Sequence, residues 1–301
     1  MTTKAHAMVL ASFAADSLSL AAHWIYDTEK IDHEFGLIDQ LLPPAIDSYH
    51  GNRHKGDFTH YGDQALLLLK HLAHNKQFDV GRFANDWREF SGSYDGYIDK
   101  ATQKTLEAMK EGKSPYACGS GSSDLGGPAR IAPLVFWYRN DPEHLMEAAH
   151  EQTRLTHTGS GVDAGTEFLV YTTLNVLDGA TPREAIEDAI DRGIQDLDLD
   201  MRLRRSLDTA DEDSRKVVEE FGQMCSIAAA LPGAVHLVLS HQEDLREALI
   251  ANVMAGGDSA ARGLVVGMIL GAYLGIETIE NDWVAQMRAT AEIKKYLAMA
   301  P

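Results

Sequence analysis

The chain has 301 residues, with 45 acidic side chains against 27 basic ones, and its formal net charge is −18. This acidic balance argues against a nucleic-acid-binding protein, which needs a basic surface to contact the phosphate backbone. Two cysteines, Cys118 and Cys225, are too few for a disulfide framework and lack the spacing of metal ligands.

Three further features of composition concern localisation and metal binding. The N-terminal residues have no basic segment that runs into a long apolar stretch, so we expect no signal peptide and a cytoplasmic protein. The longest apolar run is roughly 13 residues, short of the ~20 that cross a bilayer, so we expect no membrane partner. The thirteen histidines are scattered along the chain, which favours surface and capping roles over a histidine metal cluster.

Apolar residues recur at helical spacing through nearly the whole chain, beginning with Met8, Phe13 and Leu18. The segment 168–173 has strand propensity, but its neighbours offer no partner strands, so we predict helix there as well. No linker divides the chain, so the sequence predicts one all-α domain over residues 1–301. The predicted helices cover 4–22, 64–74, 80–93, 97–111, 128–139, 142–155, 162–178, 182–193, 212–231, 242–254, 259–275 and 281–298.

Helix start and stop signals sharpen some of these boundaries. Thr181 precedes Pro182, and Glu184 follows three residues after Thr181, which is the pattern of a capping box. Asp141 before Pro142 is a similar start. The segment 231–233, Leu-Pro-Gly, predicts that one helix ends there and another follows.

Three loops carry polar or glycine-rich sequence. The longest is 32–62, and loops above about 12–15 residues in a compact domain are usually functional or disordered. It contains an unusual concentration of ionisable residues, namely His50, Arg53, His54, Asp57 and His60. The glycine-rich loops 118–128 and 156–161 each lead into a predicted helix.

The most distinctive segment is Gly256-Gly257-Asp258, which precedes a helix with glycine at 263, 267, 271 and 275. One face of this helix carries almost no side chain, so another backbone can approach it closely. The glycine pair directs Asp258 and the first free N–H groups of the helix into one small volume. Two interpretations stay open: Asp258 is an N-cap, or it helps to hold a cation or a polar ligand.

The chain resembles the ADP-ribosylglycohydrolase family at four loop-to-helix junctions: 62–65, 124–133, 156–158 and 256–259. Ala15-Asp16-Ser17, Thr156-His157 and Leu231-Pro232 occupy family-like positions, and the resemblance extends from about residue 5 to about residue 276. Segments 23–27, 58–64 and 257–263 look most like a divergent branch close to the J1 crystallins of jellyfish lens. The resemblance implies an all-α, single-domain orthogonal helical bundle and a hydrolase of ADP-ribosyl or related glycosidic bonds.

The resemblance also implies a magnesium site, with manganese as an alternative. Typical members carry Thr-Asp-Asp-Thr at the first metal motif, where this chain has Gly62, Asp63, Gln64 and Ala65. At the last motif the acids are reduced to Asp258, followed by Ser259, Ala260 and Ala261. Since carboxylates supply most of the affinity for Mg²⁺, we expect one ion or none. The expected ligands are Asp63, Asp258, the Gln64 carbonyl and the Ser259 hydroxyl.

The same resemblance assigns roles to site residues. Asp63 and Asp258 are the expected catalytic acids: one holds the metal or ribose hydroxyls and the other activates water beside an oxocarbenium-like centre. The expected substrate-binding residues are Gly126, Gly127, Arg130, His157 and Gly257, with the glycine loop and Arg130 facing a diphosphate. Each of these residues also has a purely structural alternative. Asp63 would be an N-cap, His157 would have a capping role, and Arg130 would pair with an acidic side chain of the protein. Asp16 either assists catalysis or bonds a neighbouring loop.

Two classes of function therefore stay open. The first is a hydrolase that takes a small-molecule or ADP-ribosylated substrate, and the second is a non-catalytic ligand-binding or structural relative that has lost most metal ligands. Hydrolysis of another amide or guanidine-like bond is also compatible with these residues. The sequence does not determine the acceptor or the oligomeric state.

Overall fold

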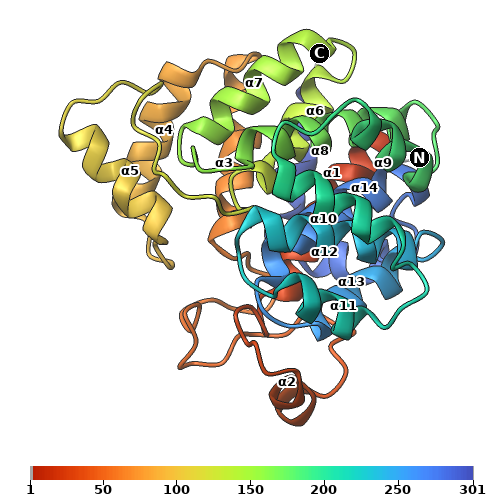
Figure 1. The fold of residues 1–301 in the computed structure, drawn as a ribbon. Coiled ribbons are helices and arrows are strands. Elements are labelled where there is room, and N and C mark those ends of the chain that lie inside the picture. Colours follow the sequence, from red (N-terminus) through yellow and green to blue (C-terminus); the bar gives the residue numbers. More distant parts are fainter. Residues whose placement is uncertain (1–2, 301) are drawn as a thin grey trace.

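The computed structural model describes residues 3–300, and within that range its regular elements are all helices (Figure 1). Two isolated bridges, Ser120 with His157 and Asp124 with Ser226, join loops. The elements are α1 (Lys4–Ser19), α2 (Thr28–Phe35), α3 (His60–Asn75), α4 (Val80–Ser93), α5 (Lys100–Lys110), η1 (Pro128–Arg130), α6 (Ala132–Tyr138), α7 (Pro142–Arg154), α8 (Val162–Leu177), α9 (Pro182–Asp191), α10 (Leu197–Leu207), α11 (Ser214–Phe221), α12 (Ile227–Ser240), α13 (Leu245–Met254), α14 (Ser259–Leu274), η2 (Glu280–Val284) and α15 (Thr290–Leu297).

The all-α prediction is confirmed, including at the segment with strand propensity. Residues 168–173 lie inside α8, where most of them are buried. The capping box at the start of α9 is also confirmed: Thr181 accepts from the Glu184 N–H, and the Glu184 carboxylate accepts from the Thr181 N–H.

Four local predictions are wrong. Pro232 does not end a helix but lies inside α12, where burial of residues on every side supports the helix despite one missing N–H donor. The loop 32–62 is interrupted by the end of α2, and α10 was not predicted at all. Residues 281–298 form a short π-helical turn and α15 rather than one helix.

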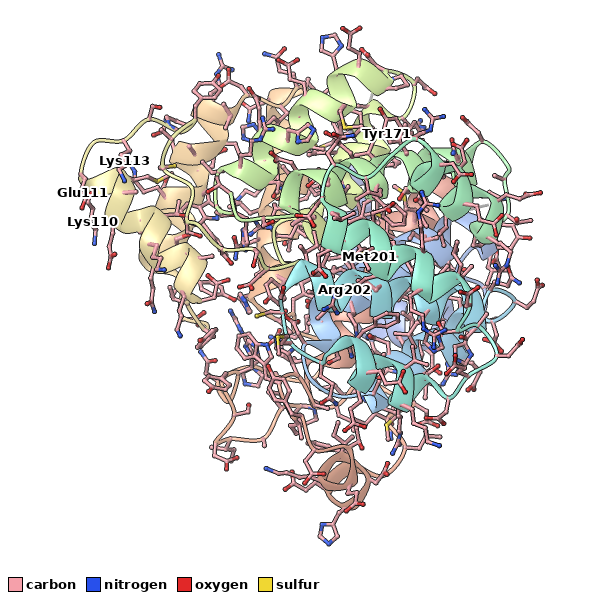
Figure 2. All side chains as sticks on the ribbon, in the orientation of Figure 1. Lys110, Glu111, Lys113, Tyr171, Met201 and Arg202 are labelled. Carbon is pink, nitrogen blue, oxygen red and sulfur yellow. The ribbon has the colours of Figure 1, made fainter. Side chains whose placement is uncertain are left out.

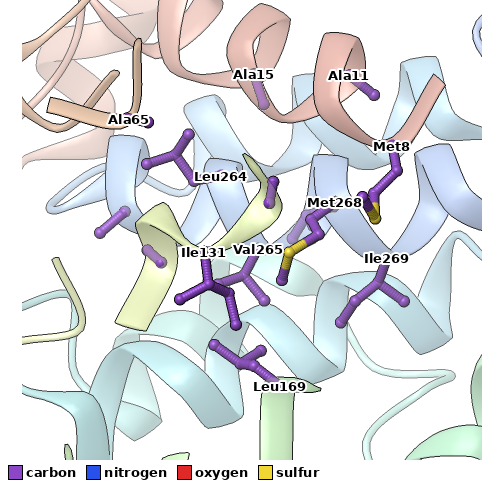
Figure 3. Packing of buried hydrophobic residues seen from close by; sticks show 14 of the residues in the cluster. Met8, Ala11, Ala15, Ala65, Ile131, Leu169, Leu264, Val265, Met268 and Ile269 are labelled. Atoms are coloured by element: carbon purple, nitrogen blue, oxygen red, sulfur yellow. The ribbon is translucent and has the colours of Figure 1, made fainter. Parts of the chain in front are cut away.

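The glycine face of α14 packs against α1 in the centre of the molecule (Figure 1; Figure 3). A Cβ added to Gly267 would lie 2.5 Å from the carbonyl oxygen of Ala11, and one on Gly271 would lie 2.6 Å from the Ala11 Cβ. Close approach also lets the Ser12 hydroxyl donate to the Leu264 carbonyl at 2.9 Å. The predicted close contact is therefore confirmed, although Gly275 is the C-cap of α14 with φ +84°.

Other helices surround this central pair. Figure 1 shows α4 and α5 at one edge and α2 with its flanking coil at another. Lys110, Glu111 and Lys113 lie at the exposed end of α5 (Figure 2). A buried hydrophobic cluster includes residues from Ala5 to Leu297. Between residues 3 and 300, no helix is both long enough and apolar enough to cross a bilayer.

Candidate functional site

Asp258 is the N-cap of α14 and is fully buried. Gly256 and Gly257 adopt φ of +69° and +66°, a conformation that glycine reaches without strain, and so turn the chain into the helix. The Asp258 Oδ1 accepts from the Ala261 N–H at 3.2 Å, and its Oδ2 accepts from the Tyr61 hydroxyl at 3.1 Å. The capping interpretation is thus confirmed. Burial raises the pKa of Asp258 above its usual value.

Trp24 connects the end of α1 to this turn. Its backbone has φ +66°, which is unusual and costly for a bulky residue. Two backbone bonds hold it there: the Trp24 N–H donates to the Gly257 carbonyl at 2.8 Å, and the Gly257 N–H donates to the Ile25 carbonyl at 2.7 Å. The adjacent His23 consequently lies with its Nδ1 3.8 Å from the Asp258 Oδ1.

Asp63 lies in the first turn of α3, whose N-cap is Thr59, so the N-cap alternative for Asp63 is wrong. Its Oδ2 accepts from the Arg53 guanidinium at 2.8 Å and from the Tyr94 hydroxyl at 2.6 Å. The Asp63 side chain keeps 19% of its surface exposed. Burial raises its pKa to about 6, even though the Arg53 charge acts in the opposite direction.

Asp16 bonds the segment that begins α3. Its carboxylate accepts from the Thr59 N–H at 2.8 Å, the Thr59 hydroxyl at 2.6 Å and the Gly62 N–H at 3.2 Å. A Cβ at Gly62 would lie 2.5 Å from the Asp16 Oδ2, so this contact requires glycine. Asp16 is fully buried, and burial raises its pKa to about 6. These contacts match the expectation that Asp16 bonds a neighbouring loop.

Gln64 and Arg130 belong to one buried hydrogen-bond network. The Gln64 Oε1 accepts from Arg130 Nη1 and, at 2.9 Å, from the Trp87 indole N–H. Arg130 also donates to the Thr156 hydroxyl at 2.8 Å. Burial lowers the pKa of Arg130 to about 10. The predicted metal ligand Gln64 and the predicted phosphate ligand Arg130 thus contact each other inside the protein.

The loop with Gly126 and Gly127 packs behind Tyr61. A Cβ at Gly126 would run into the Tyr61 ring, and one at Gly127 would lie 2.8 Å from His157 Cγ. His157 is buried, and its Nδ1 is 2.8 Å from the Thr156 hydroxyl. Burial lowers its pKa to about 4, so the ring is neutral at physiological pH. These contacts bring the loop close to Tyr61, and through Tyr61 to Asp258.

The remaining predicted metal ligand, Ser259, is buried beside Asp258. Its hydroxyl has no hydrogen-bond partner within residues 3–300. Mg²⁺ prefers about six oxygen ligands, whereas Gln64 here already accepts from two donors and Asp63 from the Arg53 guanidinium. The residues present therefore fit a magnesium ion poorly.

Three histidines that are far apart in the sequence meet beside Asp258. His23 follows α1, His50 lies in the loop after α2, and His60 begins α3. One nitrogen of each lies within 4.8 Å of the others, and all three side chains are buried. The expectation of surface and capping roles is therefore wrong for these three residues. The one signal in the sequence was the concentration of ionisable residues in the loop that holds His50 and His60.

Aromatic side chains form one wall of this histidine cluster. The rings of Trp24, Tyr49 and Tyr97 contact one another with centroid separations of 5.0 or 5.1 Å. Trp24 also stacks on His23 at 4.4 Å, and Tyr49 is 62% exposed. The cluster therefore lies just below an aromatic surface.

Known proteins are similar to this chain over most of its length. A family model described as ADP-ribosylglycohydrolase matches residues 1–300. Crystallin J1A of Tripedalia cystophora is 22% identical over 97% of this chain and 94% of its own length. ADP-ribosylhydrolase ARH3 of Gallus gallus is 24% identical over 88% of this chain and 84% of its own length.

A solved structure has a similar fold. It is described as an ADP-ribosylglycohydrolase-related protein complex, and it superposes with a TM-score of 0.74 at 22% sequence identity. The match covers 99% of this chain and 96% of the other. The predicted type of helical bundle is thereby confirmed.

Proposed function

Because the chain belongs to the ADP-ribosylglycohydrolase family, we propose that it hydrolyses an ADP-ribosyl or related glycosidic bond. The observation that carries the proposal is Asp63, a partly exposed carboxyl group at a family motif whose pKa is raised to about 6. A carboxyl group with a pKa near neutrality suits proton transfer at physiological pH.

In this proposal water adds to the anomeric carbon through an oxocarbenium-like transition state as the bond to the leaving group breaks. Asp63 accepts a proton from that water and passes it to the departing group, so no net proton is consumed. Arg53 and Tyr94 hold the Asp63 carboxylate in place through its Oδ2. Asp258 provides the second carboxylate and positions Tyr61, because both of its oxygens already accept hydrogen bonds inside the protein.

The substrate-binding residues stay proposals as well. The backbones of three glycines form part of the wall around Asp258. Gly126 packs against Tyr61, Gly127 packs against His157, and Gly257 is hydrogen-bonded to Trp24. Arg130 and His157 lie behind that wall, and we propose that both fix its shape while the Arg130 charge gives it a positive potential toward a diphosphate. This assignment favours a small-molecule or ADP-ribosylated substrate.

The magnesium expected from the resemblance, or manganese in its place, stays a prediction. Its ligands would be Asp63, Asp258, Gln64 and Ser259. Gln64 and Asp63, however, already accept hydrogen bonds from guanidinium groups. We therefore assign no step of the reaction to that ion. The cytoplasmic location stays a prediction as well.

A second candidate function is a non-catalytic ligand-binding or structural role. It is favoured by the similarity to crystallin J1A over 97% of this chain, together with the engaged Gln64. Binding of ADP-ribose without any hydrolysis would favour this candidate.

Calorimetric titration of ADP-ribose, with and without millimolar Mg²⁺, tests the proposed substrate. We expect saturable binding that the Asp63→Asn variant weakens. The matched control is Asp95→Asn, because Asp95 also contacts Arg53, at 3.4 Å, but is 82% exposed. Absence of binding under both conditions would contradict the proposal.

A further inference from the structure

The buried histidines His23, His50 and His60 carry ring nitrogens that no other group satisfies. Their relative exposures are 4%, 1% and 1%. Within residues 3–300, His23 Nε2, both ring nitrogens of His50 and His60 Nδ1 have no hydrogen-bond partner, while His60 Nε2 faces the Asp99 carboxylate at 3.4 Å. Buried polar atoms without partners cost free energy and are rare in native proteins, so a cluster of four calls for a ligand.

The spacing of the three rings suits a single ion. Their centroids are separated by 5.4 Å (His23–His50), 5.6 Å (His50–His60) and 6.2 Å (His23–His60). Three imidazoles around a tetrahedral ion with metal–nitrogen bonds of about 2.0–2.1 Å have centroids about 5 Å apart. The ligand nitrogens lie within 4.8 Å of one another, and the side chains must rotate for all three to bond one ion.

One of the three histidines has a carboxylate beside its second ring nitrogen: His60 Nε2 lies 3.4 Å from the Asp99 Oδ2. His23 Nδ1 lies 3.8 Å from the Asp258 Oδ1 and accepts from the Ala260 N–H at 3.4 Å. Metal-bound histidines usually donate their second ring N–H to a carboxylate or a carbonyl, which fixes the tautomer. With Asp99 beside Nε2, His60 Nδ1 is left free to bind an ion, and Nε2 is the ring nitrogen of His23 that has no partner.

We propose that His23, His50 and His60 bind one first-row transition-metal ion of the zinc class. Imidazole nitrogen suits Zn²⁺, Ni²⁺ and Cu²⁺, whereas Mg²⁺ prefers oxygen ligands. Three protein ligands leave one coordination position for water or for a substrate atom, which is the pattern of catalytic zinc sites.

This inference goes beyond the proposed function, because ion binding is measured without any substrate. Titration of the metal-free protein with Co²⁺, followed by visible absorption, should give one equivalent with the intense bands of a tetrahedral site. Zn²⁺ should abolish those bands, and Mg²⁺ should leave them unchanged. Absence of stoichiometric Co²⁺ and Zn²⁺ binding by the intact protein would overturn the proposal whatever the variants do.

Variants then locate the ion. His50→Gln should weaken Zn²⁺ binding at least 100-fold, whereas His33→Gln, at an exposed position on α2, should bind as the unmodified chain does. Asp99→Asn should weaken binding about 10–100-fold, because Asp99 positions His60. Asparagine can still cap α5 there, so the fold is preserved. Unchanged affinity in folded His50→Gln protein would show that the ion binds elsewhere.

Discussion

The Tyr61 hydroxyl donates to the Asp258 carboxylate at 3.1 Å, although the two residues are 197 positions apart in the sequence. This bond joins the first turn of α3 to the N-terminus of α14. Asp63 lies on the same turn of α3, so the two predicted catalytic acids are connected through Tyr61 while they engage different partners. Tyr61 and Asp258 are both buried.

Replacement of Tyr61 by phenylalanine should destabilise the protein. The change removes one of the donors to the buried Asp258 carboxylate, and such a loss costs about 1–3 kcal/mol. Denaturant unfolding of Tyr61→Phe measures the free energy of unfolding. Tyr116→Phe is the matched control, since Tyr116 is 74% exposed and its loss should change little. Equal stability of the two variants would contradict the structural role of this bond.

Replacement of Gly267 by alanine should also destabilise the protein. The new Cβ would lie 2.5 Å from the Ala11 carbonyl oxygen, so α1 and α14 must move apart, at a cost of about 1–3 kcal/mol. Gly92→Ala is the control, because Gly92 lies in α4 with nothing within 4 Å of a new Cβ. That variant should be stabilised by up to about 1 kcal/mol. Thermal unfolding of both variants measures these changes in stability. A stabilised Gly267→Ala variant would contradict the close packing of α14 against α1.

Some of these features were predictable from local sequence and others were not. The glycine spacing of α14, the turn before Asp258 and the capping box at Thr181 depend on neighbouring residues, so the sequence predicts them directly. The histidine cluster depends on three separate segments that only tertiary packing brings together. Pro232 departs from the prediction for a related reason: the local rule ends a helix at proline, whereas packing on all sides supports α12.

At the site, the contacts of Gln64 likewise depend on tertiary packing and not on neighbouring residues. From the sequence its carbonyl is a candidate metal ligand, but in the structure it accepts from Trp87 and Arg130. Gln64→Leu should therefore lower the free energy of unfolding by about 1–3 kcal/mol, because two buried donors lose their acceptor. Gln103→Leu, on the exposed face of α5, is the control. If chemical denaturation gave the same midpoint for both variants, the network would contribute nothing to stability.

His236 should make stability depend on pH. It is buried in α12 between the hydroxyls of Thr209 and Ser214, each at 2.9 Å, and burial lowers its pKa to about 4 from 6.5. Below pH 6.5 the unfolded chain takes up a proton that the folded protein does not bind. The contribution of His236 is therefore complete above pH 6.5 and is lost as the pH falls toward about 4.

Urea unfolding between pH 4 and pH 7.5 tests this prediction. The stability difference between the unmodified chain and His236→Gln should shrink as the pH is lowered. His33→Gln should keep a constant difference, since His33 is exposed. A difference for His236→Gln that does not vary with pH would contradict the prediction.

Hydrolysis of an ADP-ribosyl bond is the central claim, and direct measurement of free ADP-ribose tests it best. Chromatography of reactions with O-linked and N-linked ADP-ribosyl conjugates should show multiple turnovers by the unmodified chain. Asp63→Asn should lower kcat by about 10²–10⁴-fold, and Asp95→Asn should keep full activity. Full activity of Asp63→Asn, or ADP-ribose binding with no release from any conjugate, would contradict the assignment.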